Sequence, residues 1–380
     1  MEVKKGYKQT EVGVIPEDWE VVILGSIIEK LKAGVSVNSV DEETGIYGHE
    51  FAVLKTSCVS GGYFYPSESK RIHPKDINQA KVNPSKDAII ISRMNTPALV
   101  GECGYVNENY KYLFLPDRLW QTCFRRAAKI NARWLAYILS FNSYSRKIKE
   151  TATGTSGSMK NIAKEAFLNI GIPLPQESEQ TAIATALSDV DALIQSMEKL
   201  IAKKRVIKQG AMQELLKPKE GWVVKKLGEV AEIKMGQSPS SLYYNSCGVG
   251  LPLVQGNADI VDRRTIIRNY TSQVTKSCNT GDIILSVRAP VGEVAIASFK
   301  ACIGRGVCAI SYSSLFLYYY LIFIEPQWEK YSTGSTFDSV NSKVISSLEI
   351  NIPSINEQTR IATILSDMDA EITALEAKLA

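Results

Sequence analysis

Few residues of this sequence could form a catalytic or metal site. The chain has only two histidines, His49 and His73, which excludes a site that needs several imidazoles. It lacks the phosphate-binding pattern G-x-x-x-x-G-K-[ST], the dinucleotide fingerprint G-x-G-x-x-G and the Pro-Pro pair of amino-methyltransferase loops. The triplets at 68–70 and 376–378 match the E-x-K of nuclease sites, but such triplets are common. We therefore predict no catalytic residue, no metal and no cofactor.

Paired carboxylates occur twice, at Asp189/Asp191 and at Asp367/Asp369. Two residues two positions apart on a helix point to different faces, because each position turns the helix by about 100°. The pairs are therefore poor metal ligands. We interpret them as solvated or as contacts to a partner.

Basic and polar side chains, by contrast, gather in loops at corresponding places of the chain, such as 92–96 and 286–288. Arginine and lysine neutralise phosphates, and Arg, Lys, Asn, Ser and Thr can hydrogen-bond the edges of bases. The alternative is that these are ordinary solvated loops. The candidate DNA contacts are Arg93, Asn95, Thr155, Ser156, Lys160, Arg263, Arg264, Arg288, Ser335 and Asn341.

The distribution of charge agrees with a nucleic-acid partner. The formal net charge is +4, from 44 Lys+Arg and 40 Asp+Glu. Residues 19–175 carry +6 and residues 221–353 carry +2, whereas 354–380 carry −3. A modest total thus conceals basic globular regions and an acidic end, although local charge alone does not identify DNA as the partner.

The elements that position these residues occur in two copies. Residues 183–192 recur at 361–370 with eight identities in ten, at an offset of 178. The entry segments 19–25 and 222–228 also match, at an offset of 203. Further echoes are 179–181 with 357–359, 172–173 with 352–353, Asp87 with Asp282, Arg93 with Arg288, and 100–102 with 291–293. The sequence therefore predicts one module used twice.

Each copy ends in a predicted long helix with an apolar residue every three or four positions. A 3.5-residue repeat packs one helix along another. The first helix is expected from about 177 to 216, because Pro175 and Pro218 cannot continue it, which gives about 60 Å at ~1.5 Å per residue. We expect the two helices to pair antiparallel. The predicted packing residues are Ile183, Leu187, Val190, Ile194, Met197 and Ile201 in the first helix, and Ile361, Leu365, Met368, Ile372, Leu375 and Leu379 in the second.

The globular parts mix strands and helices. Residues 88–92 and 282–286 read as short buried strands. Trp134, Ile138, Phe141 and Ile148 form a helical stripe after a capping Asn131, and Leu317, Leu321, Ile324 and Trp328 form another. The fold class is therefore α+β, with a pseudo-two-fold internal repeat. The expected domains are 19–175, a helix over 176–217, 218–353 and a helix over 354–380.

The ends of the chain suggest a circular repeat. The second helix stops at Ala380, which corresponds to position 202 of the first copy, so about 20 helical residues have no equivalent. Residues 1–18 occupy the slot ahead of the first module. We expect this N-terminal segment to dock near the end of the second helix and to complete the second half.

Nothing in the sequence suggests export or a membrane span. The N-terminus has no apolar signal region, the seven cysteines show no C-x-x-C pair, and the longest apolar stretch, 315–324, is about ten residues. We expect a soluble cytoplasmic protein with reduced thiols.

At this point the layout resembles the specificity subunit of type I restriction-modification enzymes, over essentially the whole chain. The resemblance rests on the entry segment 7–19, on Leu24-Gly25, on 172–175, on Glu179-Gln180 and on the repeated helix start Ile-Ala-x-x-Leu-Ser-Asp-x-Asp. It implies two target-recognition domains joined by long conserved helices that form an antiparallel coiled coil. It also implies that each domain reads one half of a split double-stranded DNA target and that the helices set the unread spacer.

The resemblance further implies partners. Methylation and cleavage would belong to separate modification (methyltransferase) subunits and a restriction (endonuclease/translocase) subunit that dock on this chain, in agreement with the missing catalytic motifs. Two alternatives remain from the residues. One is a self-contained restriction or modification enzyme, and the other is a two-headed protein- or glycan-binding scaffold without a nucleic-acid role.

Overall fold

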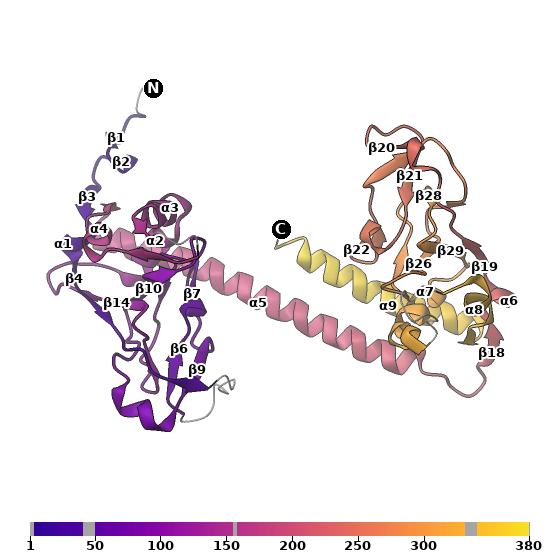
Figure 1. Cartoon of the computed structure of the whole chain (residues 1–380), viewed down its shortest axis with the longest axis horizontal. Helices are drawn as coiled ribbons and strands as arrows, with labels where there is room; N and C mark the ends of the chain where they lie inside the picture. Colours follow the sequence, from indigo (N-terminus) through magenta and orange to yellow (C-terminus); the bar gives the residue numbers. More distant parts are fainter. Residues whose placement is uncertain (1–3, 41–49, 155–157, 331–339, 380) are drawn as a thin grey trace. The chain divides into compact units, whose positions relative to one another are not determined.

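The structure, a computed structural model, describes residues 4–40, 50–154, 158–330 and 340–379. The chain divides into two compact units, residues 1–192 and 193–380. Both units mix strands and helices, as an α+β fold requires. The long helix α5 (Glu177–Leu216) gives its first part to one unit and its second part to the other (Figure 1). Its bounds are those that the flanking prolines predict.

The first unit is built mostly from short strands. Its strands are β1 (Tyr7–Thr10), β2 (Gly13–Pro16), β3 (Glu20–Ile23), β4 (Ile28–Ala33), β5 (Ser39–Val40), β6 (Ala52–Leu54), β7 (Val59–Ser60), β8 (Gly62–Phe64), β9 (Ser69–Ile72), β10 (Ile89–Ser92), β11 (Met94–Asn95), β12 (Cys103–Tyr105), β13 (Leu113–Phe114), β14 (Leu119–Phe124), β15 (Ala152–Thr153), β16 (Lys160–Ile162) and β17 (Gly171–Leu174). Its helices before α5 are α1 (Leu24–Ile27), α2 (Ala132–Ser140), α3 (Asn142–Glu150) and α4 (Lys164–Leu168), with 3₁₀ turns η1 (Thr56–Cys58) and η2 (Pro74–Gln79).

The second unit follows the same plan. Its strands are β18 (Val223–Lys226), β19 (Glu232–Met235), β20 (Tyr244–Asn245), β21 (Leu251–Val254), β22 (Ile260–Val261), β23 (Arg264–Thr265), β24 (Asn269–Thr271), β25 (Ser277–Cys278), β26 (Ile283–Ser286), β27 (Val294–Ile296), β28 (Ala301–Ile303), β29 (Val307–Ser311) and β30 (Glu349–Ile352). Its helices after α5 are α6 (Leu227–Val230), α7 (Leu315–Phe323), α8 (Ser342–Ser347) and α9 (Ile355–Glu376), with 3₁₀ turns η3 (Ser241–Tyr243), η4 (Asn257–Asp259) and η5 (Glu325–Lys330).

The two largest sheets of each unit share one topology, while the three-stranded sheet β11-β16-β15 is described in the first unit only. The six-stranded order β4-β14-β10-β12-β8-β7 recurs as β19-β29-β26-β27-β23-β22. In both sheets the pair β12·β8 or β27·β23 is parallel, while the strands flanking the centre are antiparallel. A second sheet recurs as β13-β6-β9-β5 and β28-β21-β24-β20, with β25 added in the second unit. The internal repeat predicted from the module edges is therefore confirmed in the interiors, where the two sequences differ.

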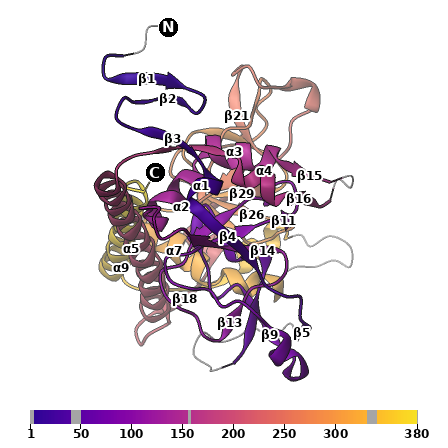
Figure 2. The ribbon, with the colours of Figure 1, turned by 90° about the vertical axis from the view of Figure 1, so that its left-hand side faces the viewer.

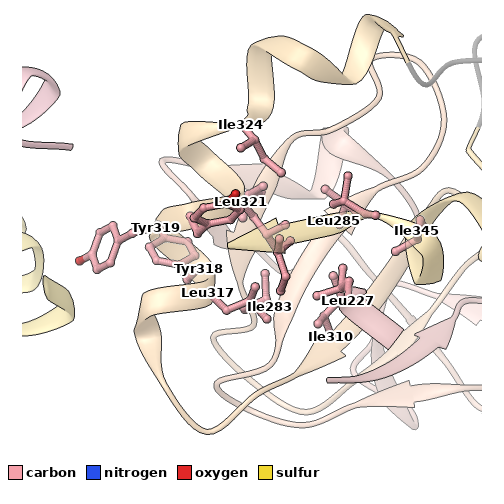
Figure 3. Close-up of a cluster of buried hydrophobic side chains, with 14 of the residues drawn as sticks. Leu227, Ile283, Leu285, Ile310, Leu317, Tyr318, Tyr319, Leu321, Ile324 and Ile345 are labelled. Atoms are coloured by element: carbon pink, nitrogen blue, oxygen red, sulfur yellow. The ribbon is translucent and has the colours of Figure 1, made fainter. Parts of the chain in front are cut away.

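The central strands β10 and β26 are unbroken apolar runs because both of their faces are covered. Ile89 and Ile91 belong to a cluster with the helices, while Ile90, between them, faces a second cluster on the other side. Figure 3 shows the helix-side cluster of the second unit, with Ile283 and Leu285 of β26 beside Leu317 and Leu321 of α7. Each unit is thus layered, with helices on one face of its larger sheet and a further apolar layer on the other.

The matching entry segments and Ile-Pro segments recur because they pair with each other. β3 is antiparallel to β17, with Ile172 opposite Val22, and β18 is antiparallel to β30, with Ile352 opposite Val223. The side chain of Trp19 donates from Nε1 to Glu179 Oε2 at 3.0 Å, at the start of α5. These two-strand ribbons therefore bring the beginning and the end of each copy together, next to the start of its long helix.

A buried glutamine holds the start of each long helix. Gln180 donates from Nε2 to the carbonyls of Pro175 (2.9 Å) and Lys129 (3.2 Å), and its Oε1 accepts from Asn131 N at 2.9 Å. Its equivalent Gln358 donates to the Pro353 carbonyl at 3.0 Å and accepts from the Tyr312 hydroxyl at 2.9 Å. The Glu-Gln of the repeated motif thus has a structural reason, because the amide ties the helix to the segment before α2 or α7.

Within the second unit, α9 runs antiparallel to the second part of α5 (Figure 1). Lys204 pairs with Glu371 at 2.7 Å, and Lys208 pairs with Asp369, so the numbers rise on one helix as they fall on the other. Arg205 pairs with Glu376 at 2.6 Å. The acidic α9 and the basic stretch of α5 are complementary in charge, and the predicted antiparallel pairing is observed here.

The predicted packing residues divide between covered and exposed positions. In α9, Ile361, Leu365 and Ile372 are buried, and Met368 and Leu375 are half-buried, whereas Leu379, also half-buried, lies in the turn after the helix ends at Glu376. In α5, Ile201 is 5% exposed and Ile183 and Met197 are half-buried, but Leu187, Val190 and Ile194 are 42%, 53% and 41% exposed. The stretch of α5 that packs with α9 begins near Ile201 and continues to Leu216, so most of the predicted α5 residues precede it.

Two local expectations were wrong. The stripe Trp134, Ile138, Phe141 and Ile148 was expected on one helix. Instead α2 ends at Ser140 and α3 begins at Asn142, and the side chain of Phe141 between them is 64% exposed. Asn131 does cap α2, since its Oδ1 accepts from Trp134 N at 3.0 Å. In the second copy, Trp328 lies on η5, beyond the end of α7. In the first copy, two short helices therefore bury Trp134 and Ile148 and leave Phe141, at the junction between them, exposed.

The N-terminal segment forms a β-hairpin of β1 and β2 that leads into β3 (Figure 2). Residues ahead of Trp222, the equivalent slot of the second copy, are instead the end of α5. The two copies therefore differ in what precedes their entry segments. Among the described residues, no helix is long and apolar enough to cross a membrane, and all seven cysteines are free thiols.

Candidate nucleic-acid interface

The described part of the chain contains no group of three or more His, Cys, Asp or Glu side chains that could hold a metal ion. A groove of about 930 Å³ lies in the second unit between α5, α9 and the turn before β23 and is lined by both acidic and basic side chains. The fold brings some of the candidate DNA contacts together and leaves others apart.

In the first unit, two predicted loops meet beside the end of β10. Asn95 of β11 lies opposite Lys160 of β16, so residues 92–96 and 158–162 form one surface. The amide of Ile162 donates to the Arg93 carbonyl at 2.9 Å. Lys160 is half-buried and donates to the Gly154 carbonyl at 3.0 Å. Thr155 and Ser156 lie outside the described residues.

Two of these side chains are already engaged within the protein. Asn95 is buried, donates to Ser92 Oγ at 3.1 Å and accepts from Thr96 N at 2.8 Å, so it shapes the turn. Arg93 donates from Nε to the Asp117 carbonyl at 2.9 Å, and its guanidinium lies 5.7 Å from the centre of the Trp120 ring. Arg93 is half-buried, with part of its guanidinium committed.

In the second unit, the equivalent surface lies beside the end of β26. Arg288 is exposed and makes no hydrogen bond or ion pair within the described residues. The amide of Val340 donates to the Val287 carbonyl at 3.0 Å, which places Asn341 next to this turn. Asn341 caps α8, since its Oδ1 accepts from Val344 N at 3.1 Å. Ser335 lies outside the described residues.

The backbone shows that the sequence echo of Arg93 with Arg288 was out of register by one residue. Arg93 N donates to the Arg118 carbonyl and Val287 N to the Gly306 carbonyl, so Val287 is the equivalent of Arg93. The amides of Gly101 and Gly292 close the same turn onto Ser92 and Ser286. The two arginines therefore lie on equivalent turns but not at equivalent positions, and their side chains leave the turn differently.

The same contacts identify two arginines that sequence reasoning missed. Arg118 and Arg305 are exposed and lie on the turn before β14 and β29, next to the ends of β10 and β26. Arg305 stands between Gly304 and Gly306, and a Cβ at Gly306 would come within 2.1 Å of the Gln255 carbonyl oxygen. Only sheet order places these turns together, so no local pattern could have shown them.

Arg263 and Arg264 lie elsewhere. β23 pairs with the end of β27 that is opposite the start of β26, so these residues are at the other end of the sheet from Arg288. Arg263 binds Glu325 through two 2.7 Å hydrogen bonds and the Val294 carbonyl at 3.2 Å, and Glu325 raises the pKa of its guanidinium. Asp262 and Arg263 both have positive φ, +47° and +62°. Arg263 thus holds a strained turn, while Arg264 is exposed.

We name the two surfaces the basic turns, defined by Arg93, Arg118 and Lys160 in the first unit and by Arg288 and Arg305 in the second. Each stands at the end of the central strand of its larger sheet, a rigid support for side chains that must meet a target in a fixed geometry. Guanidinium groups in this position can bind phosphates or guanine edges.

The second carboxylates of the repeated pairs are not free. Tyr137 of α2 donates its hydroxyl to Asp191 Oδ2, and Arg133 approaches the same oxygen at 3.5 Å. Tyr319 of α7 donates to Asp369 Oδ2 at 2.9 Å, and Lys208 binds the other oxygen. Asp189 and Asp367 are exposed. The expectation of solvation or partner contact therefore holds for the first member of each pair and was wrong for the second.

Comparison with known proteins gives one consistent family. Residues 16–203 and 219–380 match the type I restriction modification DNA specificity domain. The chain is 30% identical to the putative type I restriction enzyme MjaX specificity subunit of Methanocaldococcus jannaschii, over 96% of this chain and 90% of that protein.

Solved structures agree in fold. A chain from a structure concerning complex assembly and conformational transition of the type I R-M system has a TM-score of 0.58 and 24% identity, over 96% of this chain and 93% of that one. The type I restriction-modification S subunit from M. genitalium has a TM-score of 0.64 and 17% identity, over 100% and 94%. Two matched domains, which together cover most of the chain, show that this chain belongs to the type I restriction modification DNA specificity family.

Proposed function

We propose that this chain is the DNA-recognition subunit of a type I restriction-modification complex, and that each unit reads one half of a bipartite double-stranded target. The observation that carries the proposal is the repeat of the two largest sheets, with a basic turn that carries an exposed arginine at the end of the central strand in each unit. Two readers in one chain replace the two subunits of a dimeric DNA-binding protein. Because the readers differ in sequence, the half-sites differ as well.

The basic turns supply both kinds of contact that DNA reading needs. Exposed arginines neutralise phosphates and form bidentate bonds to guanine, while phosphate contacts alone fix position without reading sequence. The first unit carries the higher net charge, +6 for residues 19–175 against +2 for 221–353. We therefore assign the larger share of salt-dependent affinity to the first unit.

The chain itself is proposed to be non-catalytic and to need no cofactor. Methylation is assigned to modification (methyltransferase) subunits and cleavage to a restriction (endonuclease/translocase) subunit, both of which bind this chain in the cytoplasm. The support is the family to which the chain belongs, in which the relatives are named specificity subunits of type I restriction enzymes.

Selection of bound sequences from a random duplex pool tests the proposal. The full chain, alone and co-purified with any modification subunits that it binds, is expected to recover two short conserved blocks separated by a gap of fixed length. A single uninterrupted block, or no enrichment at low salt, would overturn it. Loss of binding to random DNA with rising salt checks the phosphate contacts separately.

A further inference from the structure

Each copy carries a set of three polar side chains that join the long helix to its own recognition unit. We call this set the tyrosine–aspartate clamp, formed by Tyr137, Ser188 and Asp191 in the first unit and by Tyr319, Ser366 and Asp369 in the second. Ser188 and Asp191 are Ser366 and Asp369 at the repeat offset of 178, so the Leu-Ser-Asp-x-Asp motif supplies both members from the helix. The tyrosine comes from α2 or α7.

The first clamp is densely bonded. The Tyr137 hydroxyl donates to Asp191 and lies 3.2 Å from Ser188 Oγ, and Arg133 Nη2 lies 3.1 Å from the Tyr137 oxygen. The Asp191 side chain keeps only 16% of its exposure. Asp191 therefore ties α5 to two side chains of α2, Tyr137 and Arg133.

The second clamp uses the same parts with a different cation. The Tyr319 hydroxyl donates to Asp369 at 2.9 Å, and Ser366, one helical turn before Asp369, lines the same groove as both of them. The carboxylate is shared with Lys208, whose Nζ also lies 5.6 Å from the centre of the Tyr319 ring. In Figure 3 the Tyr319 hydroxyl points away from the apolar cluster that holds its helix. The clamp thus joins α7, α9 and α5.

The clamp and the buried glutamine together fix the direction of the helix axis relative to the unit. Gln180 and Asp191 are 11 residues apart, as are Gln358 and Asp369. Eleven residues make about three helical turns and about 16 Å, so both side chains lie on one face of the helix. A helix held at one end can swing about that point, whereas a second contact about 16 Å along the same face sets its axis relative to the unit.

We propose that the Tyr137–Asp191 and Tyr319–Asp369 pairs are positioning contacts that set the separation at which the two half-sites are read. The inference rests on the proposed function. Moving a half-site by one base pair shifts it by about 3.4 Å and rotates it by about 35° around the duplex. A reader whose helix axis is fixed rejects that change, and a reader whose helix can swing accepts it.

The test uses selection from the random duplex pool with Tyr137→Phe, Asp191→Asn, Tyr319→Phe and Asp369→Asn. Tyr137→Phe and Tyr319→Phe keep the packed ring and remove only the hydroxyl. The matched controls, Asp189→Asn and Asp367→Asn, change the same charge at exposed positions two residues earlier on the same helices.

The expected result is a broader distribution of gap lengths with both half-site blocks unchanged. The clamp variants should shift the ratio of the wild-type gap to gaps one base pair longer or shorter by about two- to tenfold, the size of one net hydrogen bond. The controls should match the wild type. Unchanged gap distributions in folded Tyr137→Phe and Tyr319→Phe would overturn the proposal, as would broadening in the controls to the same extent.

The outcomes separate this proposal from the proposed function. If the wild type gives no bipartite consensus, the proposed function fails. If the wild type gives one sharp gap and the clamp variants keep it, only the role of the clamp fails. Circular dichroism and thermal unfolding identify a misfolded Asp→Asn variant. In that case the gap distributions of Tyr137→Phe and Tyr319→Phe decide whether the clamp sets the gap length.

Discussion

The two clamps are built on the same helix positions but draw their cation from different places. In the first unit, Arg133 comes from α2, so the carboxylate is satisfied by the recognition unit alone. In the second unit, Lys208 comes from α5, so the carboxylate also joins two long helices. The two copies of the sequence motif therefore share the hydrogen bond from tyrosine to aspartate but differ in the cation beside it.

The comparison extends to exposure. The side chain of Asp191 is 16% exposed and that of Asp369 is 40% exposed. Ion pairs near the surface contribute little, whereas a buried carboxylate depends on its partners. The first clamp is therefore the stronger attachment of the helix to its unit. Comparing the same substitution in the two copies measures whether the two clamps contribute equally to stability.

The largest effect is expected from the cores. Trp134→Ala should lower the free energy of unfolding of the first unit by about 3–5 kcal/mol, because the ring is fully buried. Leu317→Ala, at a buried position of α7, should cost the second unit about 2–5 kcal/mol. Urea titration with hydrogen exchange resolves the two units. If either variant destabilises both units equally, the view of two separate cores is wrong.

The buried glutamines come next. Gln180→Leu leaves two carbonyls and the Asn131 amide without their partner, and should cost about 1–3 kcal/mol. Gln358→Leu removes one fewer bond and should cost less. Thermal unfolding of the pair checks the order. Equal losses would show that the additional bond to Lys129 contributes nothing.

The basic turns give an effect on DNA rather than on folding. Arg288→Ala should weaken binding to the selected target by about 1–3 kcal/mol without changing thermal stability, since its side chain binds nothing else among the described residues. Arg93→Ala should lower both DNA affinity and thermal stability, because it also removes the hydrogen bond to the Asp117 carbonyl and the contact with the Trp120 ring. If either variant weakens binding to every DNA sequence equally, its arginine contacts phosphates and not bases.

A smaller effect is expected at alkaline pH. Burial and the neighbouring aspartate raise the pKa of Tyr137 and of Tyr319 above the unfolded value near 10. The folded state then holds more protons than the unfolded state above about pH 10, so stability falls as the pH rises. Tyr137→Phe and Tyr319→Phe should each reduce that fall, which thermal unfolding between pH 8 and pH 11 measures. A steeper fall in either variant would contradict the assignment.

The smallest difference is expected between the core thiols. Burial raises the pKa of Cys103 and of Cys308 to about 12, so neither forms a thiolate near neutral pH. At pH 8 a thiol reagent should label the exposed Cys247 and leave both core thiols untouched until the protein is denatured. Early labelling of one core thiol, located by mass spectrometry, would show that its unit opens more readily than the other.

The sequence predicted the repeat, the long helix and the central strands well, because these depend on local patterns. Pro175 and Pro218 bound α5, and the short isoleucine-rich run Ile89–Ser92 favours a strand, because β-branched residues pack well on a sheet. The break at Phe141 was missed because the apolar spacing of α2 and α3 is compatible with one helix. The register of Arg93 against Arg288 was missed because a one-residue shift changes backbone pairing without changing residue types.

The candidate interface was harder to predict. Asn95 has the composition of a base-reading residue but is buried, and Arg263 is bound to Glu325, which lies 62 residues later. Arg118 and Arg305 are isolated in sequence and become neighbours of the central strand only through sheet order. Local composition indicates which residues can bind DNA, but tertiary contacts decide which of them are free to do so.

The fixed offset of 178 residues between the two helix starts has a consequence for how the gene can change. Unequal crossing-over between the two matching stretches would remove one recognition unit and rejoin the helix without altering its heptad phase, because Ile183 and Ile361 hold the same place in it. The product would keep one complete set of sheets and its own Gln, Ser and Asp on the helix. One in-frame deletion of 178 residues would thus give a chain with a single recognition unit and an unchanged heptad phase in its helix.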